Sequence, residues 1–233
     1  MNVVVCLRMT ARTSAAPLDL SDARTLARAA SLRAGGHTVT ALYSSTVAEA
    51  DAIAVALAPH ADRVVRVAGD DLTTADFHTV GQVLATAIRR IGVDLVLAPV
   101  QGEDEPFNAA PAAIARQLGA RYLPLVEEVL SLDERGAEVS LRTGGLRRRI
   151  RAALPAVLAT APGPVPQDLA ATGAAVALET MTITDPDATV VRRRTELLGR
   201  PEPASRGSQT VSSAAEMVAA LGRAQPGALS ARR

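Results

Sequence analysis

The first half of the chain alternates between two kinds of hydrophobic pattern. Short Val-rich runs predict buried strands at residues 2–7, 37–43, 62–67 and 93–98. Between them, apolar residues recur at helical spacing and predict helices at residues 21–34, 46–57, 73–91 and 106–118. Ser21 is the expected N-cap of the first helix. This β-α repeat predicts a mostly parallel sheet that is covered by helices on both faces.

The second half has a different pattern. Residues 122–129, 137–142 and 147–160 look extended and are expected to add antiparallel strands to the sheet. Residues 165–182 are low in charge and rich in Ala, which predicts a loop or a short helix. An Arg- and Pro-rich stretch precedes a last amphipathic helix, capped by Ser212 or Ser213. We therefore expect an α/β domain at residues 1–184, an arm at 185–222 and a disordered tail at 223–233.

Composition narrows the possible partners. Hydrophobic residues make up 48% of 233 residues, which is enough for a sizeable core. Aromatic residues make up only 2%, which argues against a stacking surface for single-stranded nucleic acid. The formal net charge of +1 gives no strong field toward nucleic acid or an anionic membrane. The start of the chain lacks signal-peptide features and no apolar run would span a membrane, so we expect a cytoplasmic protein.

The sequence also limits the catalytic chemistry. The chain contains no lysine, which excludes a P-loop lysine, a Schiff base and a lysine nucleophile. Its single cysteine, Cys6, excludes a disulfide framework and a multi-cysteine metal site. The three histidines, His37, His60 and His78, do not stand beside a Ser or Cys nucleophile. We expect no catalytic residue and no metal site.

Two places at the carboxyl ends of predicted strands are candidates for ligand binding, because ligands of doubly wound sheets lie there. Cys6 ends the first strand, either as a ligand contact or as a small buried apolar residue. Residues 99–108 follow the fourth strand and offer Gln101, Asp104 and Asn108 as hydrogen-bonding groups. Backbone amides near Asn108 would suit a phosphate, and a solvated turn is the competing interpretation. A GxGxxG dinucleotide motif is absent.

Four stretches, in this order and spacing, resemble one known family. They are NVVVCLR (2–8), VDLVLAPVQGEDEPFNAAPAAIA (93–115), TGGLRRRIRAALPAVLAT (143–160) and VVRRRTELLGRPEPASRGSQTVSSAAEMVAALGRA (190–224). Over nearly its whole length the chain resembles the β subunit of electron transfer flavoproteins. In the second stretch, Gln101, Asp104 and Asn108 match the family's nucleotide loop.

The resemblance implies a three-layer α/β/α sandwich of the adenine-nucleotide-binding kind with a C-terminal arm. It implies an electron carrier that is not a stand-alone enzyme and that pairs with an α-type subunit. FAD would lie mostly on that α-type subunit, and this chain would bury one AMP. A flavin dehydrogenase would bind at residues 162–182. The cofactor contacts that the resemblance implies are Cys6, Leu20, Ser21, Ser45, Pro99, Val100, Gln101, Gly102, Asp104, Asn108, Ala109 and Ala110.

The chain departs from the family pattern in several places. The segment between Arg8 and Leu18 is shorter than the family's hairpin, and Pro99 stands where the family has Gly. Residues 162–182 lack the basic residues of the family's partner-binding stretch. Divergent β subunits of this type occur beside the peptide-derived cofactor mycofactocin, which is one hypothesis for this chain. The alternative is a flavin-free nucleotide-binding or structural module similar to universal-stress-type proteins, although a free module has no need of the arm.

Overall fold

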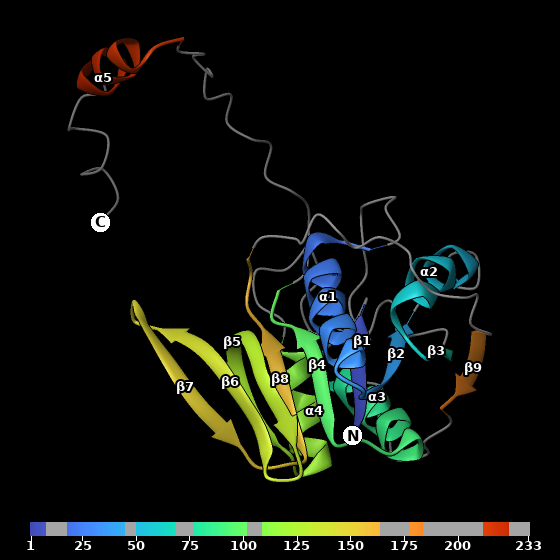
Figure 1. Ribbon diagram of the computed structural model, residues 1–233. Helices are drawn as coiled ribbons and strands as arrows, with labels where there is room; N and C mark the ends of the chain where they lie inside the picture. Colours follow the sequence, from blue (N-terminus) through green and yellow to red (C-terminus); the bar gives the residue numbers. More distant parts are fainter. Residues whose placement is uncertain are drawn as a thin grey trace. The chain divides into compact units, whose positions relative to one another are not determined.

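The computed structural model describes residues 1–7, 18–44, 50–68, 77–101, 109–163, 178–183 and 212–223. The chain divides into two units, residues 1–194 and 195–233. The first unit contains one nine-stranded sheet in the order β7-β6-β5-β8-β4-β1-β2-β3-β9 (Figure 1). Its strands are β1 (Asn2–Leu7), β2 (Thr38–Ser44), β3 (Arg63–Ala68), β4 (Leu95–Pro99), β5 (Arg121–Asp133), β6 (Gly136–Thr143), β7 (Leu146–Ala152), β8 (Ala156–Thr160) and β9 (Leu178–Thr182). Its helices are α1 (Leu20–Ala34), α2 (Ala50–Leu57), the 3-10 turn η2 (Ala58–His60), α3 (Phe77–Ile91) and α4 (Ala110–Leu118).

The predicted parallel α/β fold is confirmed. Strands β3, β2, β1, β4, β8 and β5 pair in parallel, and β9 joins β3 in parallel at one edge. The Val-rich runs form strands because β-branched side chains fit a pleated surface that is buried on both faces. The strand at residues 2–7 has the predicted bounds. The described parts of α2 and α3 begin at Ala50 and Phe77; their earlier predicted starts lie outside the described residues.

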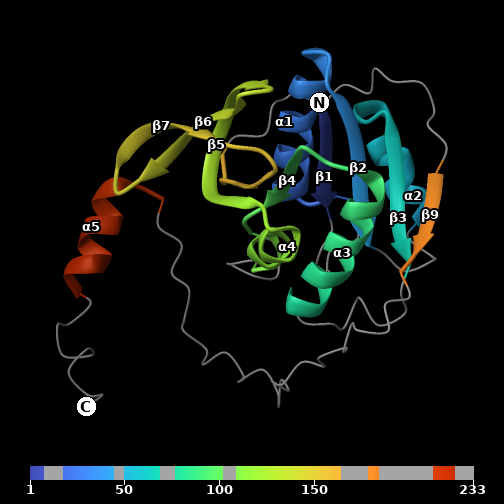
Figure 2. The same cartoon turned by 90° about the horizontal axis from the view of Figure 1, so that it is seen from below.

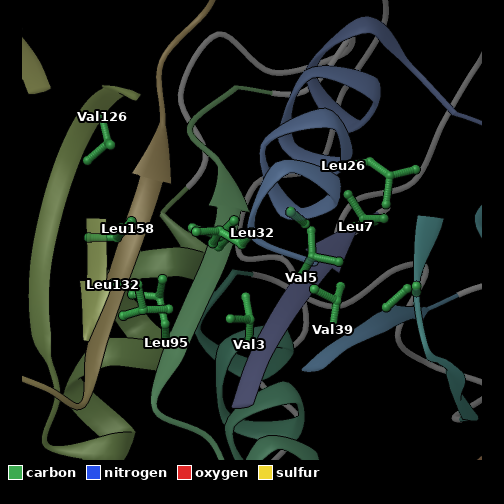
Figure 3. Packing of buried hydrophobic residues seen from close by; sticks show 14 of the residues in the cluster. Val3, Val5, Leu7, Leu26, Leu32, Val39, Leu95, Val126, Leu132 and Leu158 are labelled. Carbon is green, nitrogen blue, oxygen red and sulfur yellow. The ribbon is translucent and has the colours of Figure 1, made fainter. Parts of the chain in front are cut away.

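Two hydrophobic clusters hold helices on opposite faces of the sheet. In β1, Val3, Val5 and Leu7 pack on the side of α1 and α2, together with Leu26 (Figure 3). The alternate residues of β1 pack with α3 and α4 on the other side. Figure 2 shows α3 and α4 side by side on that face, with α1 on the opposite one. Successive strand residues point to opposite faces, so one short apolar run contributes to both clusters. The result is a three-layer α/β/α sandwich.

The prediction of one antiparallel stretch at residues 147–160 was wrong. The segment forms two strands, β7 and β8, separated by residues 153–155. β7 pairs antiparallel with β6, whereas β8 lies between β4 and β5 and is parallel to both. All five residues of β8 are buried. The hydrophobic run AVLAT therefore forms a central strand, while the Arg-rich part forms an edge strand.

The expectation of a loop or short helix over residues 165–182 was wrong at its end. Residues Leu178–Thr182 form β9, the strand at the other edge of the sheet. The Arg63 guanidinium holds it there with two hydrogen bonds to the Glu179 carboxylate, at 2.8 and 3.0 Å. These hydrogen bonds lower the pKa of Glu179. Residues 164–177 lie outside the described residues.

The first helix is capped by a residue other than the expected Ser21. Asp19 is the N-cap of α1, and its carboxylate accepts a hydrogen bond of 2.7 Å from the Asp22 backbone N–H. Ser21 lies inside the first turn, where its carbonyl oxygen accepts a hydrogen bond from the Thr25 hydroxyl. Asp and Ser are almost equally good N-caps, so the local sequence does not decide between them.

The β5–β6–β7 meander carries a ladder of ion pairs at the far edge of the sheet (Figure 1). Arg147 pairs with Glu127, and both Arg149 and Arg151 pair with Glu138. These arginine side chains are 42–70% exposed, so each pair contributes only ~0–1 kcal/mol to folding. Their charge protects the free edge of β7 against pairing with other chains.

Helices α3 and α4 approach each other closely at one glycine. A Cβ atom added at Gly81 would lie 2.5 Å from the Ala113 Cβ. We expect Gly81→Ala to lower the free energy of unfolding by about 1–2 kcal/mol, because overpacking outweighs the better helix propensity of Ala. Ala113→Gly alone should cost about 1 kcal/mol. The double variant should regain nearly wild-type stability in urea unfolding, since the added methyl group fills the space that was vacated. Additive losses would contradict this packing.

The second unit contains one described helix, α5 (Ala214–Arg223). The Ser213 hydroxyl accepts a hydrogen bond of 3.2 Å from the Glu216 N–H, and the Glu216 carboxylate accepts one of 2.8 Å from the Ser212 N–H. The helix is thus capped by its own sequence, as expected. Met217 and Val218 are 49% and 68% exposed. Among the described helices of both units, none combines the length and the apolar character needed to cross a membrane.

Candidate functional site

The candidate site lies at the carboxyl edge of the parallel strands. β1 ends at Leu7, β4 at Pro99 and β8 at Thr160, and α1 and α4 begin at this edge. Buried polar residues gather here beside α1, which is unusual in so apolar a core: they are Asp19, Asp22, Thr25, Ser44 and Thr160. The predicted contacts of the first strand, the first helix and the fourth strand therefore belong to one region of the fold.

The structure places eight of the predicted cofactor contacts within this region. Leu20 is 62% exposed at the start of α1, with Ser21 half-buried beside it. Pro99 and Val100 are buried at the end of β4, and Gln101 is half-buried. Ala109 is exposed and Ala110 is buried at the start of α4. Ser45, Gly102, Asp104 and Asn108 lie outside the described residues, so their roles stay predictions.

Cys6 is a core residue on the α3 and α4 side of the sheet. Its side chain is fully buried and packs in the same cluster as Val4 and Leu42. Burial raises the pKa of the Cys6 thiol to about 12, because the thiolate would be poorly solvated. The sulfur is therefore a neutral thiol at neutral pH and is not a nucleophile. A backbone contact with a ligand remains the predicted role of this residue.

Two threonines join the elements that surround the site. The Thr25 and Thr160 hydroxyl oxygens are 2.6 Å apart. The Thr160 hydroxyl also lies 3.2 Å from the Ala98 carbonyl oxygen, and the Thr160 carbonyl accepts a hydrogen bond of 3.3 Å from the Val100 N–H. Sequence reasoning missed both residues. The available signal was Thr160 at the end of an apolar strand, where a hydroxyl needs a buried partner.

The N-termini of α1 and α4 differ in charge. α1 begins with the Asp19 carboxylate as its cap and has Asp22 in its first turn. α4 has Ala109 at its N-cap, a proline within its first two positions and no acidic residue in its first turn. Both helices present the positive end of their dipole at this edge. The two carboxylates at the start of α1 repel an anion there.

Titratable groups elsewhere offer no catalytic arrangement among the described residues. Burial lowers the pKa of His60, and the nearby positive charge of Arg33 lowers it further. Burial and the N-terminal amine lower the pKa of His37. Both histidines lie near the amino ends of the strands, away from the carboxyl edge. No cluster of three metal-ligating side chains occurs in the part of the chain that the structure describes.

The lowered pKa of His60 makes stability depend on pH. The unfolded state binds a proton near pH 6.5, whereas the folded state resists it. The contribution of His60 to the free energy of unfolding is therefore lost as the pH falls from about 6.5 through the lower pKa of folded-state His60. We expect the difference in unfolding free energy between wild type and His60→Asn to shrink over this range. Urea unfolding from pH 7.5 downward measures it, and a constant difference would contradict the assignment.

A separate groove of about 320 Å³ lies between the C-terminal half of α1 and the second half of β5. Leu32 and Leu132 contribute apolar surface, while Arg28 and Glu128 contribute opposite charges. The Arg28 guanidinium also donates to the Glu127 carbonyl at 2.8 Å and to the Ala161 carbonyl at 3.3 Å. None of the eight predicted site residues that the structure describes lines this groove.

Comparison with known proteins agrees with this geometry. Residues 8–187 match the model of the electron transfer flavoprotein domain. A search of curated proteins gave no match. The matched range includes the strands on both sides of β1, the segment after β4 and the meander. It covers most of the first unit and well over half of the chain. The chain therefore belongs to the electron transfer flavoprotein domain family.

Proposed function

We propose that the chain is the β-type subunit of a heterodimeric electron transfer flavoprotein that receives electrons from a flavin dehydrogenase. FAD is held mainly on an α-type partner subunit, and this chain forms one wall of its site. Bound FAD would supply the redox chemistry, while this chain would help to bind and orient the flavin and shield it from water. The observation that carries the proposal is the family match over residues 8–187 on a doubly wound α/β sandwich.

We further propose that this chain holds one AMP at the carboxyl edge of the sheet. The two carboxylates at the start of α1 support an orientation with the phosphate away from that helix end, toward the N-terminus of α4. The adenosine part then faces the ends of β1 and the start of α1. Because this edge combines buried polar groups with the positive dipole end of α4, the chemistry of the described residues fits a nucleoside monophosphate.

The AMP proposal predicts that Asp104→Ala and Asn108→Ala each weaken AMP binding by about 1–3 kcal/mol, through the loss of a hydrogen bond to a buried or charged group. Isothermal titration of the full chain measures this effect. Glu134→Ala, in the exposed turn between β5 and β6, is the matched control and should bind AMP as the wild type does. Equal affinities of all four proteins would show that the Asp104 and Asn108 side chains do not bind the nucleotide.

Co-expression with an α-type subunit tests the main proposal. We expect a heterodimer with a flavin absorbance spectrum, and no stable flavin on this chain alone. Stoichiometric FAD on the isolated chain would contradict the shared site. A colourless complex, or an isolated chain that binds only a nucleotide, would instead support the flavin-free module. Residues 162–182 as the contact of the dehydrogenase, the association with mycofactocin and the cytoplasmic location all stay predictions.

A further inference from the structure

Two threonine hydroxyls at the carboxyl edge are linked to each other and not to solvent. Thr25 lies in the second turn of α1 and is fully buried, and Thr160 ends β8 and is 3% exposed. Their Oγ1 atoms are 2.6 Å apart, and either atom can donate the proton. Separation of this buried pair would leave each hydroxyl with only its one carbonyl contact and no water to replace the lost bond.

The two ends of this hydroxyl link reach the two elements that border the site. The Thr25 Oγ1 lies 2.8 Å from the Ser21 carbonyl oxygen, in the first turn of α1. On the other side, Thr160 contacts the Ala98 carbonyl through its hydroxyl and the Val100 N–H through its carbonyl. Ala98 and Val100 flank Pro99, the last residue of β4. The link thus runs from the start of α1 to the start of the segment after β4.

The two hydroxyls share two protons among three contacts, so one of the two carbonyl oxygens receives no hydroxyl proton at any moment. In either arrangement the hydroxyl pair stays bonded and one end of it bonds to a carbonyl, at Ser21 or at Ala98. The backbone bond from the Val100 N–H to the Thr160 carbonyl is a further tie to the segment after β4.

We infer that Thr25 and Thr160 are positioning residues for the nucleotide site. They set the spacing between the first turn of α1 and residues 99–101, both of which belong to the proposed AMP site. Neither side chain touches AMP, because both are buried beneath that edge. The inference rests on the proposed AMP binding and adds to it the residues that hold the two sides in register.

Replacing either hydroxyl by a methyl group tests this inference. Thr25→Val and Thr160→Val keep the side-chain shape, and Arg28 still ties α1 to the Ala161 carbonyl after β8. We expect each variant to bind AMP about tenfold more weakly, which is ~1.4 kcal/mol. The double variant should be little weaker than either single one, because both hydroxyls form one link. Thr25→Ser and Thr160→Ser keep the hydroxyls and should restore most of the affinity.

A third threonine provides the matched control. Thr86 on α3 makes the same kind of contact as Thr25, with its Oγ1 3.0 Å from the carbonyl oxygen of Gln82, four residues earlier. Thr86→Val should therefore lose a similar hydrogen bond and leave AMP affinity unchanged. Urea unfolding of all variants, in parallel with isothermal titration of the full chain with AMP, separates a loss of stability from a loss of binding.

Amide hydrogen exchange without nucleotide gives a second readout. In Thr160→Val the Val100 amide should exchange faster, while the Ala113 amide, bonded to the Ala109 carbonyl at 3.1 Å, should not change. Wild-type affinity in both valine variants, or equal weakening in Thr86→Val, would overturn the inference. If the wild type itself binds no AMP, the proposed nucleotide site is wrong and the inference falls with it. An unchanged exchange rate at Val100 would overturn the positioning role alone.

Discussion

Gly136→Ala should lower the free energy of unfolding by about 3 kcal/mol, through backbone strain and overpacking together. Gly136 begins β6 with a φ of 134°, a conformation that side chains rarely adopt. A Cβ atom there would clash with the Ala152 carbonyl oxygen on β7. The oxygen belongs to the backbone of a paired strand, so it can move away only if the meander shifts.

Gly144→Ala separates the two causes. Gly144 also has a positive φ, of 59°, but a Cβ atom there would meet nothing within 4 Å. It should therefore cost only about 1 kcal/mol, the penalty of the left-handed conformation for Ala. Urea unfolding of both variants measures the difference. Similar losses in the two proteins would show that the contact with the Ala152 carbonyl relaxes at no cost.

Deletion of residues 184–233 should leave a folded α/β domain that no longer holds an α-type partner or its FAD. The arm combines the arginine run 192–194 with Pro201 and Pro203, which prevent one continuous helix through it. Its last helix, α5, is capped by its own residues and leaves Met217 and Val218 exposed. Apolar side chains on a separate unit need a partner to cover them, and Arg suits interface ion pairs.

A finer variant tests α5 within the full chain. Met217→Ser with Val218→Ser should weaken the heterodimer at least tenfold, since two apolar side chains leave the interface. Ala215→Ser, at an exposed position of the same helix, should have little effect. Size-exclusion chromatography and the flavin spectrum of the co-expressed complex report the outcome. A truncated chain that still yields a yellow heterodimer would show that the arm does not hold the partner.

The parallel half of the fold could be predicted from the sequence, because composition and hydrophobic pattern both favour a strand in each of its short apolar runs. The run VVVCL is β-branched, apolar and short, and no helix or loop suits it. The position of β8 was not readable, because the local pattern of AVLAT says that a strand is buried but not between which neighbours. β9 was missed because Leu178–Thr182 has few strand-forming residues, and its pairing depends on β3 and on the Arg63–Glu179 contact.

Only part of the candidate site could be predicted from the sequence. The carboxyl ends of β1 and β4 were found because strand ends and helix starts follow from the β-α pattern. The Thr25–Thr160 link was missed because it joins residues 135 positions apart, and neither residue belongs to a recognisable motif. The Asp19 cap was missed because the neighbouring Ser21 fits the same rule.

The central place of β8 also determines when the sheet can be completed during synthesis. β4 and β5 are both made before β8, yet neither pairs with the other; β8 alone bridges them. In a nascent chain that ends before residue 156, the edges of β4 and β5 that pair with β8 are therefore open. The doubly wound part and the meander are then not yet joined in one sheet. Sheets that close through such distant pairings fold slowly and are prone to aggregation until the last strand arrives. Ribosome pausing ahead of residue 156 would prolong this vulnerable state, whereas pausing after residue 160 has emerged would not.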